Sequence, residues 1–324
     1  MNLKKLLFQF GPLIGLIFVF VLFMFFTPPA FYSFYNIKTI LTQTVIVGIA
    51  ALGMTIVIIS GGIDLSVGSQ IALGTVVIAT VLNIGVPVDG EVSGFITLIA
   101  ALAGIGACAL SGWIVGFITA KFNLVPFIVT LGMMQIARGV AKWIGKEQTV
   151  GTPSNGLQNL MLMDPDPAWL IIGPGVWIAI ILLILLAVVL KYTVFGRHIF
   201  AIGSNEETAR LCGINVNLNK ILIYTVGSVF VGVSSILQYS NLTVGDPTAA
   251  MGMELDIIAA VVIGGGSLNG GEGSAVGSII GALFMAVLRN GCNMLGVPNY
   301  VQEIIIGIII VGAVGIDRLK HRLN

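Results

Sequence analysis

Residues 40–59 read ILTQTVIVGIAALGMTIVII, a run of twenty residues without a charged side chain. A helix needs about 20 such residues to cross the hydrocarbon core of a bilayer. Of the 324 residues, 57% are hydrophobic and only 9% are charged, whereas soluble domains contain roughly 25% charged residues. A soluble fold could not bury that much apolar surface. The composition therefore predicts an all-α polytopic membrane protein.

About ten apolar runs are candidates for transmembrane segments. They cover residues 6–26, 40–59, 66–86, 94–120, 124–145, 170–190, 220–240, 255–266, 273–290 and 300–317. The run at 255–266 is too short to cross a bilayer alone, so we expect a broken or re-entrant helix there, its backbone covered by protein or by a water-filled cavity. The loops are too small to form a domain, which predicts a single transmembrane domain over residues 1–324.

The distribution of Lys and Arg predicts that both termini are cytoplasmic. The run at 6–26 is too long for a cleaved signal peptide and is expected to be a retained first span. If ten segments alternate from a cytoplasmic N-terminus, the outer loops contain only Lys38 and Lys146. The inner segments then contain Lys4, Lys5, Lys121, Lys191, Arg197, Arg210, Lys220, Arg318, Lys320 and Arg322. This bias agrees with the positive-inside rule.

Three further basic residues, Arg138, Lys142 and Arg289, fall near the outer ends of predicted spans. Long basic side chains at such positions can extend to the lipid headgroups while their stems stay in apolar surroundings. The alternative is that these residues line a vestibule that opens outward. The sequence leaves both interpretations open.

The sequence predicts neither catalysis nor a metal or nucleotide site in this chain. A phosphate-binding loop requires G-x-x-x-x-G-K-[ST], and that pattern is absent. The three cysteines, Cys108, Cys212 and Cys292, have neither zinc-ligand nor short disulfide spacing. The net charge of +1 argues against a nucleic-acid partner, which usually meets a basic patch.

The polar stretch 203–214, GSNEETARLCGI, predicts a short helix at about 205–212 within a cytoplasmic loop, 191–220. Ser204 and Glu207 have the spacing of a capping box, which satisfies free amides at a helix start.

Charge and glycine positions support the same helix. Glu206 and Glu207 fall in the first turn, where the helix dipole favours anions, and Arg210 follows Glu206 by four residues. Gly213 is suited to a left-handed C-terminal stop. A helix of two turns is not stable alone, so we expect it to dock, either on a partner or on its own protein.

A second informative stretch, residues 60–68, reads SGGIDLSVG. Its two glycines predict a helix break, after which Asp64 or Ser66 can cap the next helix. A carboxylate within the membrane costs roughly 2.5–3.5 kcal/mol on insertion scales, so Asp64 should face water, a partner or a helix end. A plain cap at the interface and a broken helix beside a transport path are both compatible with the pattern. The cluster GGGSLNGGEG at 264–273 predicts another break between two helical pieces.

With these stretches in view, the sequence resembles the permeases of bacterial ABC sugar importers of the ribose, xylose, arabinose and galactose type. The similar stretches occur in the family's order over most of the chain. They are residues 61–68, 130–134 with 137–139, 196–197, 201–203, 205–210 with 213–214, 254–265, and 271–274. The outer loop 146–169 does not fit the family pattern.

The resemblance implies a permease of ten helices in the bacterial inner membrane. It implies three kinds of partner: a second permease, identical or related, two ATPase subunits that carry ATP and Mg²⁺, and a periplasmic sugar-binding protein. The loop helix would then be a coupling helix that contacts the ATPase. The residues expected to make this coupling contact are Ser204, Asn205, Glu206, Glu207, Thr208, Ala209, Arg210 and Gly213.

A passage for sugars needs scattered polar groups but no tight site, because sugars present many hydroxyl groups and no net charge. The two predicted breaks are where backbone and small side chains could face such a passage. The candidates for the translocation path are Gly61, Gly62, Asp64, Ser66, Gln70 and Asn269. Each of the polar ones could instead be a helix cap.

Two other classes of protein compete with this interpretation. An ion-coupled secondary transporter usually needs intramembrane carboxylates or a carbonyl cage, and only Asp256, Glu303 and a deeply placed Asp64 could serve. A channel or membrane scaffold is the other alternative, but the sequence contains neither a ring-forming repeat nor a filter-like loop.

Overall fold

A computed structural model describes residues 3–84, 92–165 and 167–323. Within these ranges the chain is helical and forms no named strand, only an isolated bridge between Val150 and Gly245. The α-helices are α1 Leu3–Phe26, α2 Phe34–Ile59, α3 Val67–Leu82, α4 Gly94–Phe122, α5 Pro126–Ile144, α6 Pro174–Tyr192, α7 Val194–Ser204, α8 Glu206–Leu211, α9 Val216–Leu242, α10 Met253–Ile263, α11 Ala275–Met294 and α12 Asn299–Leu323. Three short 3₁₀ helices are η1 Pro29–Tyr32, η2 Gly156–Met161 and η3 Ala168–Leu170.

Each of the ten predicted apolar runs coincides with a helix, and the polytopic all-α architecture is confirmed. Within the described ranges, six helices are long and apolar enough to cross a membrane: α2, α4, α5, α6, α9 and α11. Shorter apolar stretches occur at Gly11–Phe26, Val67–Leu82 and Asn299–Gly312. The count of about ten crossings stays a prediction. Residues 85–86 of the predicted third segment lie outside the described residues.

Helix boundaries follow local capping chemistry. The side chains of Ser33, Ser93 and Ser274 accept hydrogen bonds from the amides of the third residue of α2, α4 and α11 respectively. Prolines start α5 and α6, where a missing amide does no harm. These signals start the helices close to where the apolar runs start.

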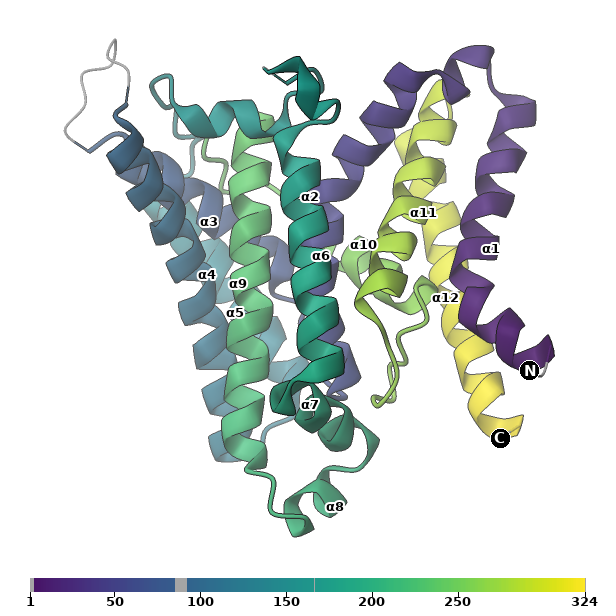
Figure 1. The fold of residues 1–324 in the computed structure, drawn as a ribbon. Coiled ribbons are helices and arrows are strands. Elements are labelled where there is room, and N and C mark those ends of the chain that lie inside the picture. The colour runs from purple at the N-terminus through teal and green to yellow at the C-terminus, as the bar shows by residue number, and fades with distance from the viewer. Residues whose placement is uncertain (1–2, 85–91, 166, 324) are drawn as a thin grey trace.

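The helices form two groups that α2 connects (Figure 1). In the first group, α9 packs on α2, α3 and α4. The second group consists of α1, α10, α11 and α12, with a core that includes Phe23, Phe31 and Met285. The chain ends, α7 and α8 lie at one end of the molecule, and α2 and α12 begin at the other (Figure 1). We call these the α8 end and the opposite end.

Candidate coupling loop and intramembrane polar sites

The loop between α6 and α9 contains two helices, α7 and α8. The sequence predicted only α8. Thr193 caps α7 by accepting a hydrogen bond from the Gly196 amide, and Ile199 and Ile202 are buried on its inner face. Apolar residues three and four apart in 194–204 were the available signal, but glycines and basic residues interrupt them. The predicted cytoplasmic loop is therefore mostly helical.

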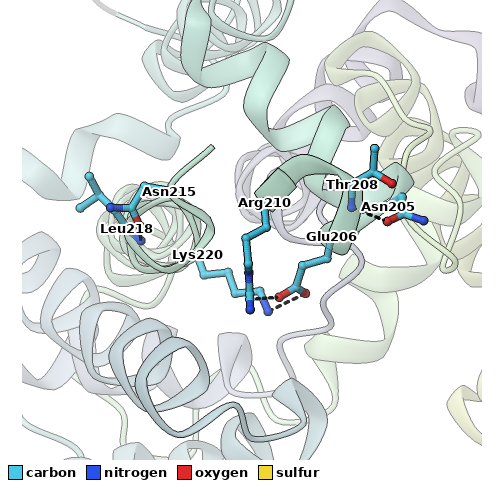
Figure 2. A network of polar contacts seen from close by, with 7 residues as sticks. All are labelled: Asn205, Glu206, Thr208, Arg210, Asn215, Leu218 and Lys220. Atoms are coloured by element: carbon cyan, nitrogen blue, oxygen red, sulfur yellow. Dashed lines mark hydrogen bonds and ion pairs between the residues drawn. The ribbon is translucent and has the colours of Figure 1, made fainter. Parts of the chain in front are cut away.

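The predicted capping box of Ser204 and Glu207 is wrong. Because α7 continues through Ser204, the chain leaves the helical conformation only at Asn205, which has φ −162° and ψ 108°. Asn205 is the N-cap of α8, and its Oδ1 accepts a hydrogen bond of 2.8 Å from the Thr208 amide (Figure 2). Residue 205 thus ends one helix and starts the next.

The predicted C-terminal stop of α8 is confirmed. Gly213 has φ +85°, in the left-handed region that favours glycine. Its amide bonds the Arg210 carbonyl and the Ile214 amide bonds the Ala209 carbonyl, both at 3.1 Å. This pair of bonds is the Schellman arrangement, which satisfies the last carbonyls of a helix.

Ion pairs hold α8 to its own turn and to α9. Glu206 Oε1 lies 3.2 Å from Arg210 Nη2, as its spacing predicted, and Glu206 Oε2 lies 2.7 Å from Lys220 Nζ (Figure 2). Asn215 caps α9 by accepting from the Leu218 amide beside this network (Figure 2). These contacts fix the direction in which α8 projects.

One face of α8 is packed and the other is open. Ala209 is buried with Ile202 of α7 and Val216 of α9. Leu211, in contrast, is 88% exposed, and Glu207 and Thr208 are exposed as well. The helix therefore docks on its own protein through the small side chain of Ala209 and the ion pair of Glu206 with Lys220, and it presents the apolar side chain of Leu211 outward.

The α7 helix joins this loop to both helix breaks. A side chain at Gly203 would collide with the Ile59 carbonyl at the end of α2, so the close approach requires glycine. The Gly271 amide donates to the same carbonyl at 2.8 Å. A displacement of α7 therefore acts on the end of α2 and on the 264–274 segment together.

The predicted break at 60–68 is confirmed, and its polar side chains are buried. Asp64 Oδ1 accepts hydrogen bonds from the amide of Ser66 at 2.8 Å and from its hydroxyl at 2.5 Å. Gln70 Nε2 donates to the same hydroxyl at 2.7 Å. The carboxylate, not the serine hydroxyl, therefore satisfies the chain just before α3. Among the described residues, no basic side chain forms an ion pair with Asp64.

The neighbourhood of this break is tightly packed. Gly62 lies against the hydroxyl of Tyr224 on α9, and the Thr130 hydroxyl of α5 approaches the Ile63 carbonyl at 3.4 Å. Gly61 is exposed and lies close to Gly270 of the other break.

The break at 264–273 is also confirmed. Gly265, Gly270 and Gly271 have φ between +76° and +91°, and the segment returns the chain from α10 to α11 (Figure 1). Asn269 is exposed. The place of these residues in a translocation path stays a prediction.

A cavity of about 640 Å³ lies elsewhere, between α2, α10, α11 and α12. Asp256 and Arg289 form an ion pair across it, with Nη2 2.6 Å from Oδ2. Gln43, Asn293 and Glu303 complete its polar lining. Sequence reasoning noted the charged residues singly but did not predict this site, although charged residues in three apolar segments were a signal.

The three outer basic residues have different surroundings. Arg289 lines the cavity, and whether this cavity is the predicted outward vestibule stays a prediction. Arg138 Nη1 instead donates to the carbonyls of Pro247 and Ala249, at 2.9 and 2.8 Å, and so fixes the segment that leads into α10. Lys142 is exposed near the end of α5. Among the described residues, no group of three His, Cys, Asp or Glu side chains could hold a metal ion.

Comparison with known proteins agrees with this architecture. The family described as "Branched-chain amino acid transport system / permease component" matches residues 36–314. The chain belongs to this permease family.

Curated relatives of the permease cover nearly its full length. It is 41% identical over 301 residues to the ribose import permease protein RbsC of Escherichia coli K12, covering 90% of this chain and 88% of the relative. The probable ABC transporter permease protein YphD of E. coli K12 is 35% identical over 286 residues, with 88% and 82% covered. The L-arabinose transport system permease protein AraH of E. coli K12 is 33% identical over 314 residues, with 97% and 92% covered. No solved structure matches.

These relatives confirm the resemblance to sugar importer permeases, and the permease is a multi-pass membrane protein. The family description mentions branched-chain amino acids, whereas the relatives named after a substrate carry the names of pentoses. Similarity at 33–41% identity over nine-tenths of the chain is the more specific of the two findings.

Proposed function

We propose that this permease is the membrane-spanning subunit of an ABC importer that moves a neutral sugar, a pentose, hexose or related compound, across the bacterial inner membrane. The relatives named for ribose import and L-arabinose transport support the substrate class. A periplasmic binding protein would deliver the sugar, and ATPase subunits would supply the energy. The observation that carries the coupling part of this proposal is α8, a helix capped at both ends whose outer face is open.

The proposed topology has ten crossings and cytoplasmic termini. It is supported by the location of both chain ends at the α8 end of the molecule, as an even number of crossings requires (Figure 1). Cysteines introduced at Ser154 and Asn205, both exposed, should react with impermeant reagents from the periplasmic and cytoplasmic side respectively. Labelling of both from one side would overturn the topology and the coupling role.

The proposed coupling contact places the exposed face of α8 in a groove of the ATPase. ATP and Mg²⁺ bind to that subunit and are not cofactors of this chain. Movement of α8 would pass through α7 to the Ile59 carbonyl, where Gly203 and Gly271 meet it. Nucleotide shifts the permease pair between states only through different affinities for them. The second permease is a copy of this chain or a related one.

The proposed translocation path combines an open and a closed part. The cavity beside Asp256 forms the open part. The breaks with Gly61, Gly62, Asp64, Ser66, Gln70 and Asn269 border the closed part near α7. Burial of Asp64, Ser66 and Gln70 supports closure of the α8 end in this conformation.

Purification of the native complex through a tag on this chain tests the assignment. We expect ATPase subunits and a second permease to copurify, and the reconstituted complex to import sugar only with ATP and the binding protein. A secondary transporter would instead purify without an ATPase and respond to an ion gradient. Passive flux without either energy source would identify a channel.

A further inference from the structure

The polar groups that line the cavity beside the Asp256–Arg289 pair belong to helices made mostly of apolar residues. Gln43 is nine residues into α2, which places it roughly 14 Å along the helix from its start at the opposite end. Arg289 lies in the C-terminal part of α11 and Glu303 in the N-terminal part of α12. Both of these helix ends lie at the opposite end of the molecule (Figure 1). Polar side chains at such depth face water or a partner rather than lipid.

Those polar side chains are accessible from the cavity. Gln43, Asn293 and Glu303 are exposed, and the Arg289 side chain keeps 42% of its surface accessible although it pairs with Asp256. The volume of about 640 Å³ falls in the range of small-molecule sites, roughly 300–1,000 Å³. The space therefore admits a molecule of monosaccharide size.

Two of these groups are held by neighbours. Asp256 binds Arg289 through a single guanidinium nitrogen, Nη2, so most of the five N–H donors of that group stay available to a ligand. Gln302 donates to Asn293 Oδ1 at 2.8 Å and also to the Val297 carbonyl at 2.8 Å. The Asn293 amide is thereby directed with its NH₂ group available as a donor.

The polar groups that line the cavity favour some classes of ligand over others. Arg289, Asn293 and Gln43 supply hydrogen-bond donors, and Asp256 and Glu303 supply acceptors. Two carboxylates against one guanidinium give the cavity an excess of one negative charge when all three are ionised. This excess disfavours sugar acids and sugar phosphates, whereas uncharged vicinal hydroxyls can donate to the carboxylates and accept from the guanidinium.

We propose that this cavity is a low-affinity subsite for an uncharged polyhydroxylated ligand, bound between Arg289, Asn293 and Gln43. The proposal deepens the proposed function and rests on it, since the ligand is the sugar in transit. It adds a site, away from both helix breaks, that contacts the substrate after the binding protein releases it.

Protection from thiol labelling tests the subsite. Asn293→Cys and Gln43→Cys are made in the assembled complex in a Cys212→Ser background, because Cys212 is exposed whereas Cys108 and Cys292 are buried. Leu162→Cys is the matched control, exposed at the opposite end but outside the cavity lining. D-ribose, L-arabinose, D-gluconate and betaine are added without binding protein at concentrations well above the millimolar range, because a millimolar site is saturated only there.

We expect either neutral sugar to slow labelling at 293 and 43 several-fold while labelling at 162 is unchanged, and gluconate and betaine to have no effect. Equal protection by betaine, stronger protection by gluconate, or no protection by either sugar would overturn the subsite. Uptake by the wild-type complex separates the two proposals. If that complex imports D-ribose or L-arabinose with ATP and these sugars still give no protection, the subsite alone is wrong. Failure to import any sugar contradicts the proposed function itself.

Discussion

Asp64 and Asp256 are both buried carboxylates at helix ends, yet their surroundings differ. Asp64 is 3% exposed and accepts hydrogen bonds from the nearby Ser66, within a break where backbones touch. Asp256 is 8% exposed and bonds to Arg289, a residue 33 positions away on another helix, beside a cavity. The Asp64 carboxylate accepts hydrogen bonds from a neighbouring residue of the same break. The Asp256 carboxylate instead connects α10 to α11 beside the cavity.

The difference separates two ways of placing a polar group in a membrane. A buried polar side chain is tolerated when its hydrogen bonds are local and complete. A charge beside water needs less compensation and stays available to a ligand. We infer that the 60–68 break is a rigid connection between α2, α3 and α7. The Asp256–Arg289 pair, in contrast, would belong to the part of the permease that contacts the substrate.

Breaking the ion pair should have the largest effect. Arg289→Met leaves the nearly buried Asp256 unpaired, and loss of a charged hydrogen bond costs about 1.5–3 kcal/mol. We expect sugar uptake to be lost and thermal unfolding of the solubilised complex to occur at lower temperature. Adding Asp256→Asn should restore most of the stability, because no unpaired charge remains, but not the uptake.

Lys142→Met is the control for Arg289→Met, since Lys142 is exposed on α5 and surface changes usually stay within about 0.5 kcal/mol. If Arg289→Met kept wild-type uptake and stability, the Asp256–Arg289 pair would contribute neither to transport nor to the stability of the fold. Recovery of uptake in the double variant would make the pair purely structural.

Changes at the other carboxylate should have smaller effects. Asp64→Ala removes the acceptor of the Ser66 amide and hydroxyl, at about 1–3 kcal/mol, and Ser66→Leu forces a larger side chain into a fully buried position, at about 1–3 kcal/mol. We expect reduced uptake while ATPase subunits still copurify.

Asp64→Asn sharpens the comparison, because it keeps an acceptor oxygen but no charge. We expect its uptake to be close to wild type. If Asp64→Asn were as defective as Asp64→Ala, the charge itself would be needed, and Asp64 would resemble Asp256.

Variants in α8 test whether a movement of this helix is transmitted through α7 to the 60–68 break. Gly213→Val strains a left-handed residue by about 1–2 kcal/mol, and Asn205→Ala removes the N-cap at about 1 kcal/mol. We expect impaired uptake with lowered or uncoupled ATPase activity and normal membrane insertion. Glu207→Ala should cost less than Asn205→Ala, because Asn205 and not the pair of Ser204 and Glu207 caps the helix. Wild-type uptake in both Gly213→Val and Asn205→Ala would exclude a coupling role.

The helices and breaks can be predicted from the sequence because apolar length and glycine clusters are local properties. The α7 helix was not predicted, because Gly196 and Arg197 interrupt its apolar residues, and this omission shifted the predicted cap of α8 from Asn205 to Ser204. The Asp256–Arg289 pair could not be predicted from the sequence, because pairing depends on how α10 and α11 are rotated relative to each other across the 264–274 segment. Local chemistry can be predicted residue by residue, whereas a cavity requires the packing of four helices.

The smallest expected effect is the affinity of the permease itself for sugar. The cavity offers a few separated polar groups, several of them exposed, so a bound sugar would exchange water for protein contacts with little net gain. Tight binding would also trap the substrate after its release from the binding protein. We therefore expect affinity no better than roughly millimolar, about −4 kcal/mol, by calorimetry on the purified complex without binding protein. Arg289→Met should abolish this weak signal and Asp64→Asn should leave it unchanged. Micromolar binding would contradict the expectation that the permease binds its substrate only weakly. It would instead indicate a permease that selects its own substrate.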